Sequence, residues 1–383
     1  MCRFTGRIDV LRPSLLDAWL ARKCASPDQN LAEAVRGEQL TRLRAQIEYV
    51  REHSTFYREH LQAGARKNFS WLDLPKLPFT EASDLRKWKK FLCVSQGDVE
   101  RLVTIQSSGT SGTPKSLAFG REDLEATKDF FKIGMAQLVQ KGNRALVLWP
   151  GAQRPYGVSA LLREALGEAG VTAYAGNPAA SLACLRLEIE KYNPHVIIAA
   201  PRQLASLAAL LADWRPAGIR HLALRGILSS AESLPKELAD VLGSRYGLLV
   251  LDHYGLTETG YGGGVECPAH DGYHLRELDI FMEIVHIESG LPLPDGQEGE
   301  IVITTLARVA MPLIRYRTGD VAAMLPGPCQ CGSPMRRLSP IRGRIVRKTA
   351  ATSPNSNNFM NPSYSIEQIE KGDLCERTVH PSL

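Results

Sequence analysis

The sequence lacks long apolar runs and any concentration of one charge. Its longest apolar run, around Leu204 to Leu211, is shorter than the about 20 residues that a membrane-spanning helix needs. The first residues, MCRFTGRIDVLRP, contain no apolar stretch of the kind found in signal peptides. The 46 basic and 41 acidic residues are spread along all 383 positions and leave a net charge of +5. We therefore expect a cytoplasmic, globular protein that binds small molecules, with no nucleic acid and no membrane among its partners.

Cysteine is also scarce. Eight cysteines in a chain of 383 residues do not make a disulfide framework. One cluster can be pursued: Cys267, Cys329 and Cys331, which His274 would complete as a Cys3His zinc site, with His270 as the competing fourth ligand. Such a zinc ion would be structural, because four protein ligands leave no open position. We favour zinc, although the C-x-C spacing is tighter than the usual C-x-x-C, and unpaired buried thiols in a reducing cytosol are the alternative.

Two apolar patterns alternate along the chain. LAEAVRGEQLTRLRAQIEYVREH, within a helical segment that reaches about Leu74, has one apolar face at helical spacing. Strand-length apolar runs at 145–150, 171–176, 196–201, 222–230 and 248–255 then alternate with helical pieces such as SALLREALGEAG and LACLRLEIEKY. This alternation predicts a parallel sheet covered on both faces, whose ligands sit beyond the carboxyl ends of the strands. From Gly264 the runs ELDIFMEIVHI, GEIVITTL and MPLIRYRTGDVAAML predict antiparallel β-structure.

The predicted fold class is α/β, with a large core of parallel sheets flanked by helices and a smaller antiparallel β-rich subdomain. With 44% apolar residues, the chain can bury a sizeable core. We divide it into a helical N-terminal segment (1–75), the α/β core (76–263), the β-rich subdomain (264–342) and a remainder (343–383). The polar stretch after Arg347 is typical of a loop or linker.

The stretch TIQSSGTSGTPKSLAF, from Thr104 to Phe119, has the composition of an anion-binding loop. Its small residues let the backbone approach a ligand closely, and its hydroxyls, amides and Lys115 can donate to phosphate oxygens. A Walker loop would need a second glycine where Pro114 stands, and proline has no amide hydrogen to donate. Taken alone, the stretch is either an altered Walker loop or a flexible linker.

Three further segments carry residue types that a nucleotide site needs. YGLTE offers the hydroxyl of Thr257 and, in Glu258, a carboxylate suited to Mg²⁺. YRTGD offers Asp320, which could accept both hydroxyls of a ribose, and the GR pair offers the guanidinium of Arg344. Each residue alone is more often a surface or turn residue, so their order and combination carry the prediction.

SSGTSGTPKS, SSAES, DHYGLTE, PLIRYRTGD and IRGR occur in this order. On these motifs the sequence resembles the adenylate-forming (acyl-CoA synthetase, AMP-binding) superfamily over about residues 80 to 347. Within it, HSTFYREHL, LTETG, EC followed by GYH, and MPLIRYRTGD are most similar to the phenylacetate-CoA ligase branch. The resemblance implies an adenylation core that uses ATP to convert a carboxylic acid to an acyl-adenylate and pyrophosphate, followed by transfer to CoA.

The resemblance also implies roles for individual residues. Lys115 would end a loop that closes on the β- and γ-phosphates, formed by Ser107, Ser108, Gly109, Thr110, Ser111, Gly112 and Thr113. Ala231 and Glu232 would lie beside the adenine, Tyr254 and the following Gly255 would form its stacking face, and Asp252 would lie near its exocyclic amine. Glu258 would bind Mg²⁺, Thr257 would contact the α-phosphate, Asp320 would hold the ribose of ATP or AMP, and Arg344 would make a contact at a domain hinge.

Departures from the family pattern cluster after Arg344. The family normally continues with an acidic hinge and a mobile C-terminal domain that carries a lysine used in adenylate formation. Here Ile345, Val346, Arg347 and Lys348 follow, and neither Lys348 nor Lys371 matches that lysine motif. We therefore expect either a truncated chain or an adenylation half that works alone or with the second domain supplied in trans, so that adenylate formation is weakened.

The leading hypothesis is an adenylate-forming enzyme for an aryl or other hydrophobic carboxylic acid. Predicted acid-binding residues are Tyr156, Gly157, His253 and Gly260, and His253 would favour a substrate with a hydrogen-bonding group. CoA or a carrier protein would be the acceptor, and a homodimer is one alternative for the assembly. A catalytically impaired nucleotide-binding sensor or scaffold is the competing function, and a P-loop kinase or NTPase is a third, which Pro114 disfavours.

Overall fold

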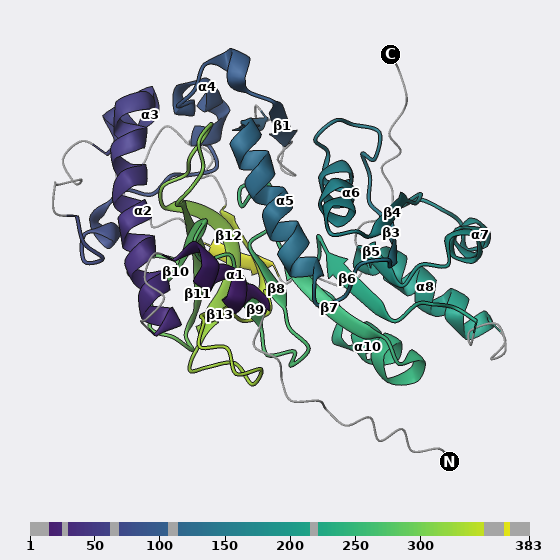
Figure 1. The fold of residues 1–383 in the computed structure, drawn as a ribbon. Helices are drawn as coiled ribbons and strands as arrows, with labels where there is room; N and C mark the ends of the chain where they lie inside the picture. The colour runs from purple at the N-terminus through teal and green to yellow at the C-terminus, as the bar shows by residue number, and fades with distance from the viewer. Residues whose placement is uncertain are drawn as a thin grey trace, which may run out of the picture.

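The computed structural model describes residues 15–24, 30–61, 69–105, 114–214, 221–347 and 364–367 (Figure 1). The helices are α1 (Leu15–Lys23), α2 (Leu31–His53), α3 (Thr55–His60), α4 (Trp88–Phe91), α5 (Arg121–Met135), α6 (Val158–Glu168), α7 (Leu182–Tyr192), α8 (Pro201–Asp213) and α10 (Lys236–Asp240). Short 3-10 turns are η1 (Leu74–Lys76), η2 (Asp84–Lys87) and η3 (Gln96–Asp98), and η4 (Val241–Arg245) is a π-helical turn.

Most strands belong to one mixed sheet. Strands β1 (Arg101–Ile105) and β2 (Lys115–Phe119) form a separate antiparallel pair. The mixed sheet contains β3 (Arg144–Leu148), β4 (Thr172–Ala175), β5 (Val196–Ala199), β6 (Gly226–Ser230), β7 (Leu249–Tyr254), β8 (Gly264–Glu266), β9 (Tyr273–Leu275), β10 (Ile280–Val285), β11 (Glu298–Thr305), β12 (Tyr316–Leu325), β13 (Arg337–Leu338), β14 (Gly343–Arg347) and β15 (Tyr364–Glu367).

The predicted α/β fold is confirmed. Strands β4, β3, β5, β6 and β7 lie side by side in that order and pair in parallel. Strand β7 then pairs antiparallel with β8, and the antiparallel run continues through β9, β13, β12, β11 and β10. The β-rich part therefore hydrogen-bonds directly to the parallel part through β8 and β9, and the two belong to one sheet.

Alternation along the parallel strands produces two separate apolar cores. In β3 and β5, Ala145, Val147, Val196 and Ile198 pack with α5 and α6, whereas their neighbours Leu146, Leu148, Ile197 and Ala199 pack with α7 and α8. Successive side chains of a strand point to opposite faces, so each strand contributes to both cores. Both faces are consequently covered by helices (Figure 1), which explains why these strands are continuous apolar runs rather than alternating ones.

The N-terminal helices are bound to the antiparallel part of the sheet. Asn30 caps α2 by accepting a hydrogen bond from the amide of Ala32 at 3.0 Å. Further along α2, the buried amide side chains of Gln39 and Gln46 donate to the carbonyl oxygens of Glu277 and Arg308. Buried amide donors need such partners, and here these bonds fix the packing of α2 against residues more than two hundred positions away.

Strand boundaries differ from the sequence-based expectation in two places. Strand β6 begins at Gly226 rather than Leu222, and MPLI, before β12, is a buried connection rather than strand. That connection ends at Arg315, which has a left-handed φ of 47° and a buried guanidinium bonded to Glu283 and to the carbonyl oxygens of Pro75 and Leu77. The prediction of β-structure in this run is correct, but the strand begins only after Arg315, because the contacts of Arg315 anchor the residues before it elsewhere.

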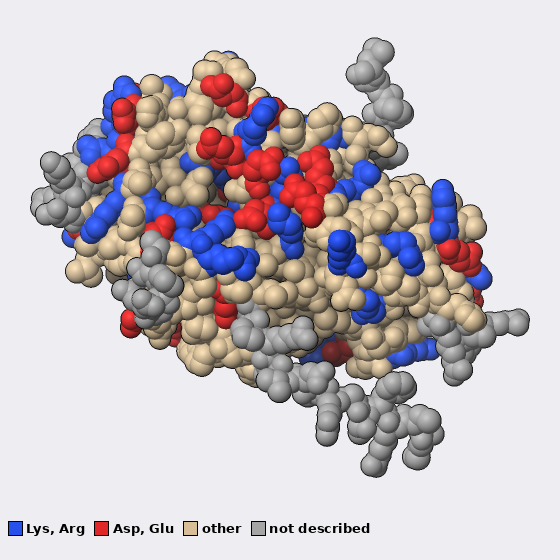
Figure 2. Space-filling view, in the orientation of Figure 1, with Lys and Arg blue, Asp and Glu red and all other residues tan. Residues whose placement is uncertain are grey.

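Charge on the surface is mixed. In Figure 2, acidic side chains gather over the region of α5 and α6, with lysines and arginines among and around them. Lys128 lies within 4 Å of Glu125, Glu164 and Glu168 there, so part of this acidic cluster is neutralised. Among the described residues, no helix is both long and apolar enough to cross a membrane.

We expect the replacement of Ile227 by alanine to lower the free energy of unfolding by about 2 to 5 kcal/mol, because it removes a fully buried side chain from the core between β6 and α8. The matched control is Leu187→Ala on α7, whose side chain is 64% exposed and which should change stability by at most about 0.5 kcal/mol. Urea unfolding followed by circular dichroism measures both variants. Equal losses in the two would contradict the assignment of the core.

Candidate functional site

The carboxyl ends of β6 and β7 open onto a cavity of ≈ 200 Å³. The two strands pair so that Ser229 lies opposite Asp252 and Ser230 opposite His253. Their last residues are followed by polar turns, and the cavity is lined by Ala231, Glu232, Ser233, Asp252, His253, Tyr254, Gly255, Leu256, Tyr273, Asp320, Ile341 and Arg344. The structure therefore brings together the residues that the sequence predicts for adenine and ribose binding.

Asp252 is a buried carboxyl at one side of this cavity. Its Oδ2 accepts a hydrogen bond of 2.7 Å from the hydroxyl of Tyr273, while its Oδ1 is buried and has no hydrogen-bond partner among the described residues. Burial raises the pKa of Asp252 to about 7, because the charged form loses its hydration. The open Oδ1 is an acceptor that a donor from a ligand could satisfy.

Asp320, on β12, also lines the cavity and has two hydrogen-bond partners. Its Oδ2 accepts from the hydroxyl of Tyr254 at 3.1 Å, and its Oδ1 accepts from Nε of Arg344 at 2.7 Å. Asp320 and Arg344 are cross-strand neighbours of β12 and β14, which explains their proximity. Burial, together with the Asp320 charge, raises the pKa of Tyr254, so this phenol stays protonated and serves as a donor.

A partly buried ion pair joins β2 to the turn after β7. Lys115, at the start of β2, places Nζ 2.6 Å from Oε1 of Glu258, and the hydroxyl of Tyr316 donates to the same oxygen at 2.8 Å. Burial alone would raise the pKa of Glu258, but the charge of Lys115 and these two hydrogen bonds outweigh it and lower the pKa. Glu258 is thus a carboxylate held ionised in a buried position, which costs free energy unless it is paired.

Several residues predicted to bind the nucleotide make few side-chain contacts that would indicate their role. Ala231 has a left-handed φ of 82°, and Glu232 beside it is exposed at the cavity mouth. Thr257 lies in the turn after β7, where its carbonyl oxygen accepts from the amide of Gly260. The predicted phosphate-loop residues from Ser107 to Thr113 lie outside the described residues.

A second, apolar cavity of ≈ 40 Å³ adjoins the first. Helices α5 and α6, strands β5 to β8, the residue after β3 and the turn between β7 and β8 supply its walls: Phe130, Phe131, Gly134, Met135, Trp149, Val158, Leu162, Ile198, Leu228, Ser230, His253, Tyr261 and Val265. This space holds only a few water molecules, so a larger group must displace wall side chains, of which the unbranched Met135 is adaptable.

Of the four predicted acid-binding residues, one lines the apolar cavity and three do not. His253 lines it, whereas Val158 and Tyr261 line it in place of their neighbours Gly157 and Gly260. Gly157 caps α6, and Gly260 lies in another pocket beside Arg276 and Arg308. Tyr156, with a left-handed φ of 56°, packs partly buried against the core. Acid binding by these residues stays a prediction.

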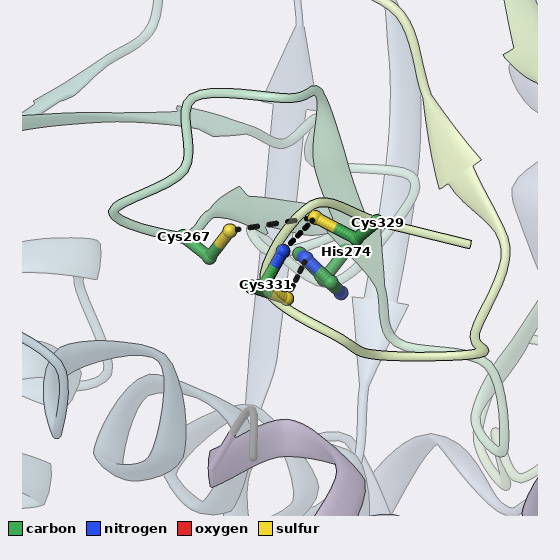
Figure 3. A group of neighbouring side chains, drawn as sticks. All are labelled: Cys267, His274, Cys329 and Cys331. Atoms are coloured by element: carbon green, nitrogen blue, oxygen red, sulfur yellow. Dashed lines mark hydrogen bonds between the residues drawn. The ribbon is translucent and has the colours of Figure 1, made fainter. Parts of the chain in front are cut away.

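The cysteine and histidine side chains form a compact, buried cluster (Figure 3). One ligand atom from each of Cys267, His274, Cys329 and Cys331 lies within 4.8 Å of every other. The sulfurs of Cys267 and Cys329 lie 3.7 Å apart, and Cys331 Sγ lies 3.6 Å from His274 Nε2. Tetrahedral zinc with bonds of about 2.3 Å to sulfur would separate two sulfurs by about 3.8 Å.

Two details of the cluster bear on the choice of ligands. His274 is buried and burial lowers its pKa to about 4, so the ring is neutral, as a metal ligand must be. His270, the competing ligand, is exposed and contacts Glu266 instead. The loop of Cys329 and Cys331 is anchored to α1, because the hydroxyl of Ser333 donates to Asp17 at 2.7 Å.

Sequence reasoning missed the two tyrosines that bind the buried carboxylates. Tyr273 lies in GYH and Tyr316 in RYRTGD, both of which are part of the resemblance, but neither was given a role. The usable signal was their position inside motifs that already contained predicted site residues. Their partners, Asp252 and Glu258, lie 21 and 58 residues away in the chain, so periodicity could not have identified the pairs.

The mixed sheet and the cavity at its strand ends agree with the comparisons with known proteins, which identify an AMP-forming ligase, an adenylate-forming enzyme. The AMP-binding enzyme family matches residues 86–307. The phenylacetate-coenzyme A ligase of Thermus thermophilus is 32% identical over 329 residues, which cover 82% of this chain and 71% of that protein. The chain therefore belongs to the AMP-binding enzyme family, as the sequence motifs predict.

Two further comparisons agree. A phenylacetate-coenzyme A ligase of Escherichia coli is 29% identical over 377 residues, covering 90% of this chain and 82% of the relative. Among solved structures, a 2-hydroxyisobutyryl-CoA ligase in complex with 2-HIB-AMP and CoA superposes with a TM-score of 0.72 at 22% identity, covering 85% of this chain and 70% of that one. At this identity the structural likeness supports the fold alone.

The raised pKa of Asp252 predicts a pH dependence of stability. Between about pH 4 and about pH 7 the folded protein keeps a proton that the unfolded chain has released, so the free energy of unfolding falls as the pH rises. Asp252→Asn should remove this contribution, and urea unfolding at about pH 5 and about pH 8 should show a smaller difference than in the wild type. Asp295→Asn, in an exposed turn, is the control, and an unchanged difference in Asp252→Asn would contradict the prediction.

Proposed function

We propose that this protein activates a hydrophobic or aryl carboxylic acid with ATP, forming an acyl-adenylate and pyrophosphate, and that CoA then accepts the acyl group. The observation that carries the proposal is the meeting of two cavities at His253: a polar one lined by the predicted adenine and ribose residues, and an apolar one beside it. Such a pair of spaces suits a nucleotide and an apolar acid held end to end.

The proposed chemistry needs little covalent participation by the protein. A carboxylate oxygen of the acid attacks the α-phosphorus of ATP, the bond to the bridging oxygen breaks, and pyrophosphate leaves. In the second step the sulfur of CoA attacks the acyl carbon and AMP leaves, while the thiol proton passes to solvent or a base. The acid is already ionised at neutral pH, so positioning and neutralisation of phosphate charge supply most of the rate enhancement.

Individual roles follow from the contacts in the polar cavity. Asp252 has an open, buried Oδ1 that suits the exocyclic amine of adenine, with Ala231 and Glu232 beside the base and Tyr254 against its face. Asp320 would accept the ribose hydroxyls, in place of or alongside its present donors Tyr254 and Arg344. Thr257 and the loop of residues 107–113 would contact the phosphates.

Glu258 and Lys115 would serve the phosphate end. Magnesium is typically held by one or two carboxylates together with phosphate oxygens and water, and a single ionised, buried Glu258 fits this role. Bound there, the ion would neutralise phosphate charge. Nζ of Lys115 lies 2.6 Å from Oε1 of Glu258. We infer that a nucleotide phosphate would take the partly buried Lys115 as its partner.

The class of acid is inferred from the apolar wall and from the relatives. The wall is built of aromatic and aliphatic side chains such as Phe130, Phe131 and Leu228, which offer no partner for a second charge. Relatives at about 30% identity are phenylacetate-coenzyme A ligases, which supports an arylacetic or similar acid. CoA is the proposed acceptor, and a carrier protein is the alternative.

We expect Lys115→Ala and Glu258→Gln each to lower acid-dependent exchange between ATP and pyrophosphate by about 10² to 10³-fold, because each removes charge stabilisation from the transition state. The measurement uses a panel of aromatic and aliphatic acids. Lys132→Ala, which alters an exposed lysine on α5, is the control and should retain full exchange. Thermal melting distinguishes lost activity from lost folding.

Two outcomes would overturn the proposed function. Nucleotide binding without exchange for any acid would favour a sensor or scaffold. Exchange that survives in both Lys115→Ala and Glu258→Gln would show that these residues are not at the reaction centre.

We further propose that the four-residue cluster of Cys267, His274, Cys329 and Cys331 holds a structural zinc ion. Three sulfurs and one neutral imidazole are a typical ligand set for this metal, and the burial of all four side chains leaves no room for substrate. The amide of Cys331 also donates to the sulfur of Cys329 at 3.4 Å, a bond that would stabilise a thiolate. Zinc would tie the strands β8 and β9 to the loop before β13.

The zinc proposal predicts about one zinc ion per purified chain and a strong loss of zinc in Cys329→Ser. The variant should also melt at a lower temperature, since metal binding contributes to folding. Cys184→Ser, which alters an exposed cysteine, is the matched control. Metal analysis of the three proteins decides: no zinc in the wild type, or equal zinc in both variants, would rule out this site.

A further inference from the structure

His253 stands where the two cavities meet. It is the penultimate residue of β7 and lines both the polar and the apolar cavity. Its neighbours in the strand, Asp252 and Tyr254, line the polar cavity alone, as expected for side chains that alternate between faces. A group of the acid that reaches His253 must therefore lie close to the carboxyl end, where acid and nucleotide join.

The imidazole of His253 has one open position. Its Nδ1 lies 2.9 Å from the hydroxyl of Ser230, the opposite residue of β6, whereas its Nε2 is buried without a hydrogen-bond partner among the described residues. Burial lowers the pKa of His253 to about 4, so the ring is neutral near pH 7. A buried polar atom without a partner is unfavourable, and a ligand that pairs with it removes that penalty.

The described groups around Nε2 of His253 form no hydrogen bond with it. Phe130 packs near the imidazole, with ring centroids 6.4 Å apart, and offers no hydrogen bond. Gly262 lies close to both rings: a Cβ at this position would lie 3.5 Å from Nε2 of His253 and only 2.6 Å from Phe130. Glycine therefore lets the backbone pass close to Phe130 and keeps a side chain away from Nε2.

We propose that the preferred acid carries a hydroxyl group within one or two carbons of its carboxyl, and that this hydroxyl pairs with Nε2 of His253. A hydroxyl can donate or accept, so it matches either tautomer that the bond to Ser230 selects. The rest of the acid is apolar, as the remaining wall requires. This inference rests on the proposed function and makes His253 a residue that determines specificity.

The test compares acids that differ only by this hydroxyl: phenylacetate against both enantiomers of mandelate, and benzoate against 2-hydroxybenzoate. For the wild type, acid-dependent pyrophosphate exchange should give kcat/KM about 10 to 100-fold higher for the hydroxylated member of at least one pair, which is the discrimination expected from one buried hydrogen bond. In His253→Phe the ratio should fall to about one, because phenylalanine fills the space without a hydrogen-bonding atom.

His253→Gln, which keeps a hydrogen-bonding side chain, should retain part of the preference, whereas a purely structural role would not distinguish Gln from Phe in this ratio. ATP binding and thermal melting show that each variant is folded. If exchange occurs but hydroxylated and plain acids react equally, or if His253→Phe lowers kcat/KM for both by the same factor, this inference is wrong and the proposed function stands. If no acid supports exchange, the proposed function itself fails.

Discussion

Strands β6 and β7 are buried on both faces and pair in register, and this pairing decides where the polar chemistry of the protein can lie. Ile227, Leu228, Val250 and Leu251 fill the two apolar cores, so hydrogen-bonding side chains can occur only at the strand ends. There the register sets Ser229 and Ser230 opposite the last polar residues of β7. The cavity at this edge follows from the packing of the sheet.

The antiparallel part of the sheet contributes charged and hydrogen-bonding side chains to the candidate site. Asp320 and Tyr316 come from β12 and Arg344 from β14, and they reach residues of β7 and the turn after it across the shared sheet. A buried carboxylate is costly unless it is paired and hydrogen-bonded, and Asp320 and Glu258 each have both kinds of partner here. The two parts of the sheet hydrogen-bond to each other through β7 and β8, which brings these residues together.

The sequence predicts the elements well where periodicity decides. Helix α2 runs from Leu31 to His53, the segment expected from its apolar face, and each parallel strand overlaps its predicted run. The motifs also predict which residues gather at the polar cavity. Contacts between residues far apart in the sequence are harder to predict. Lys115 and Glu258 are 143 positions apart, and their contact depends on how β2 packs, which cannot be predicted from local sequence patterns.

The apolar cavity shows that side-chain direction is also hard to predict from the sequence. The sequence predicts Gly157 and Gly260 as acid-binding residues, but their neighbours Val158 and Tyr261 line the apolar cavity. Adjacent residues in a turn or at the start of a helix point in different directions, so a prediction that is one residue off selects the wrong side chain. The direction of His253 is easier to predict, because successive side chains of a strand alternate between the two faces of the sheet.

Consecutive positions of β7 therefore face different spaces: Asp252 and Tyr254 line the polar cavity alone, and His253 reaches the apolar one. Under the proposed function, a substitution at position 253 would alter the choice of acid while the neighbouring contacts to the polar cavity persist. Recognition of the acid and of the nucleotide would then vary separately, although the residues proposed for both belong to the stretch DHY.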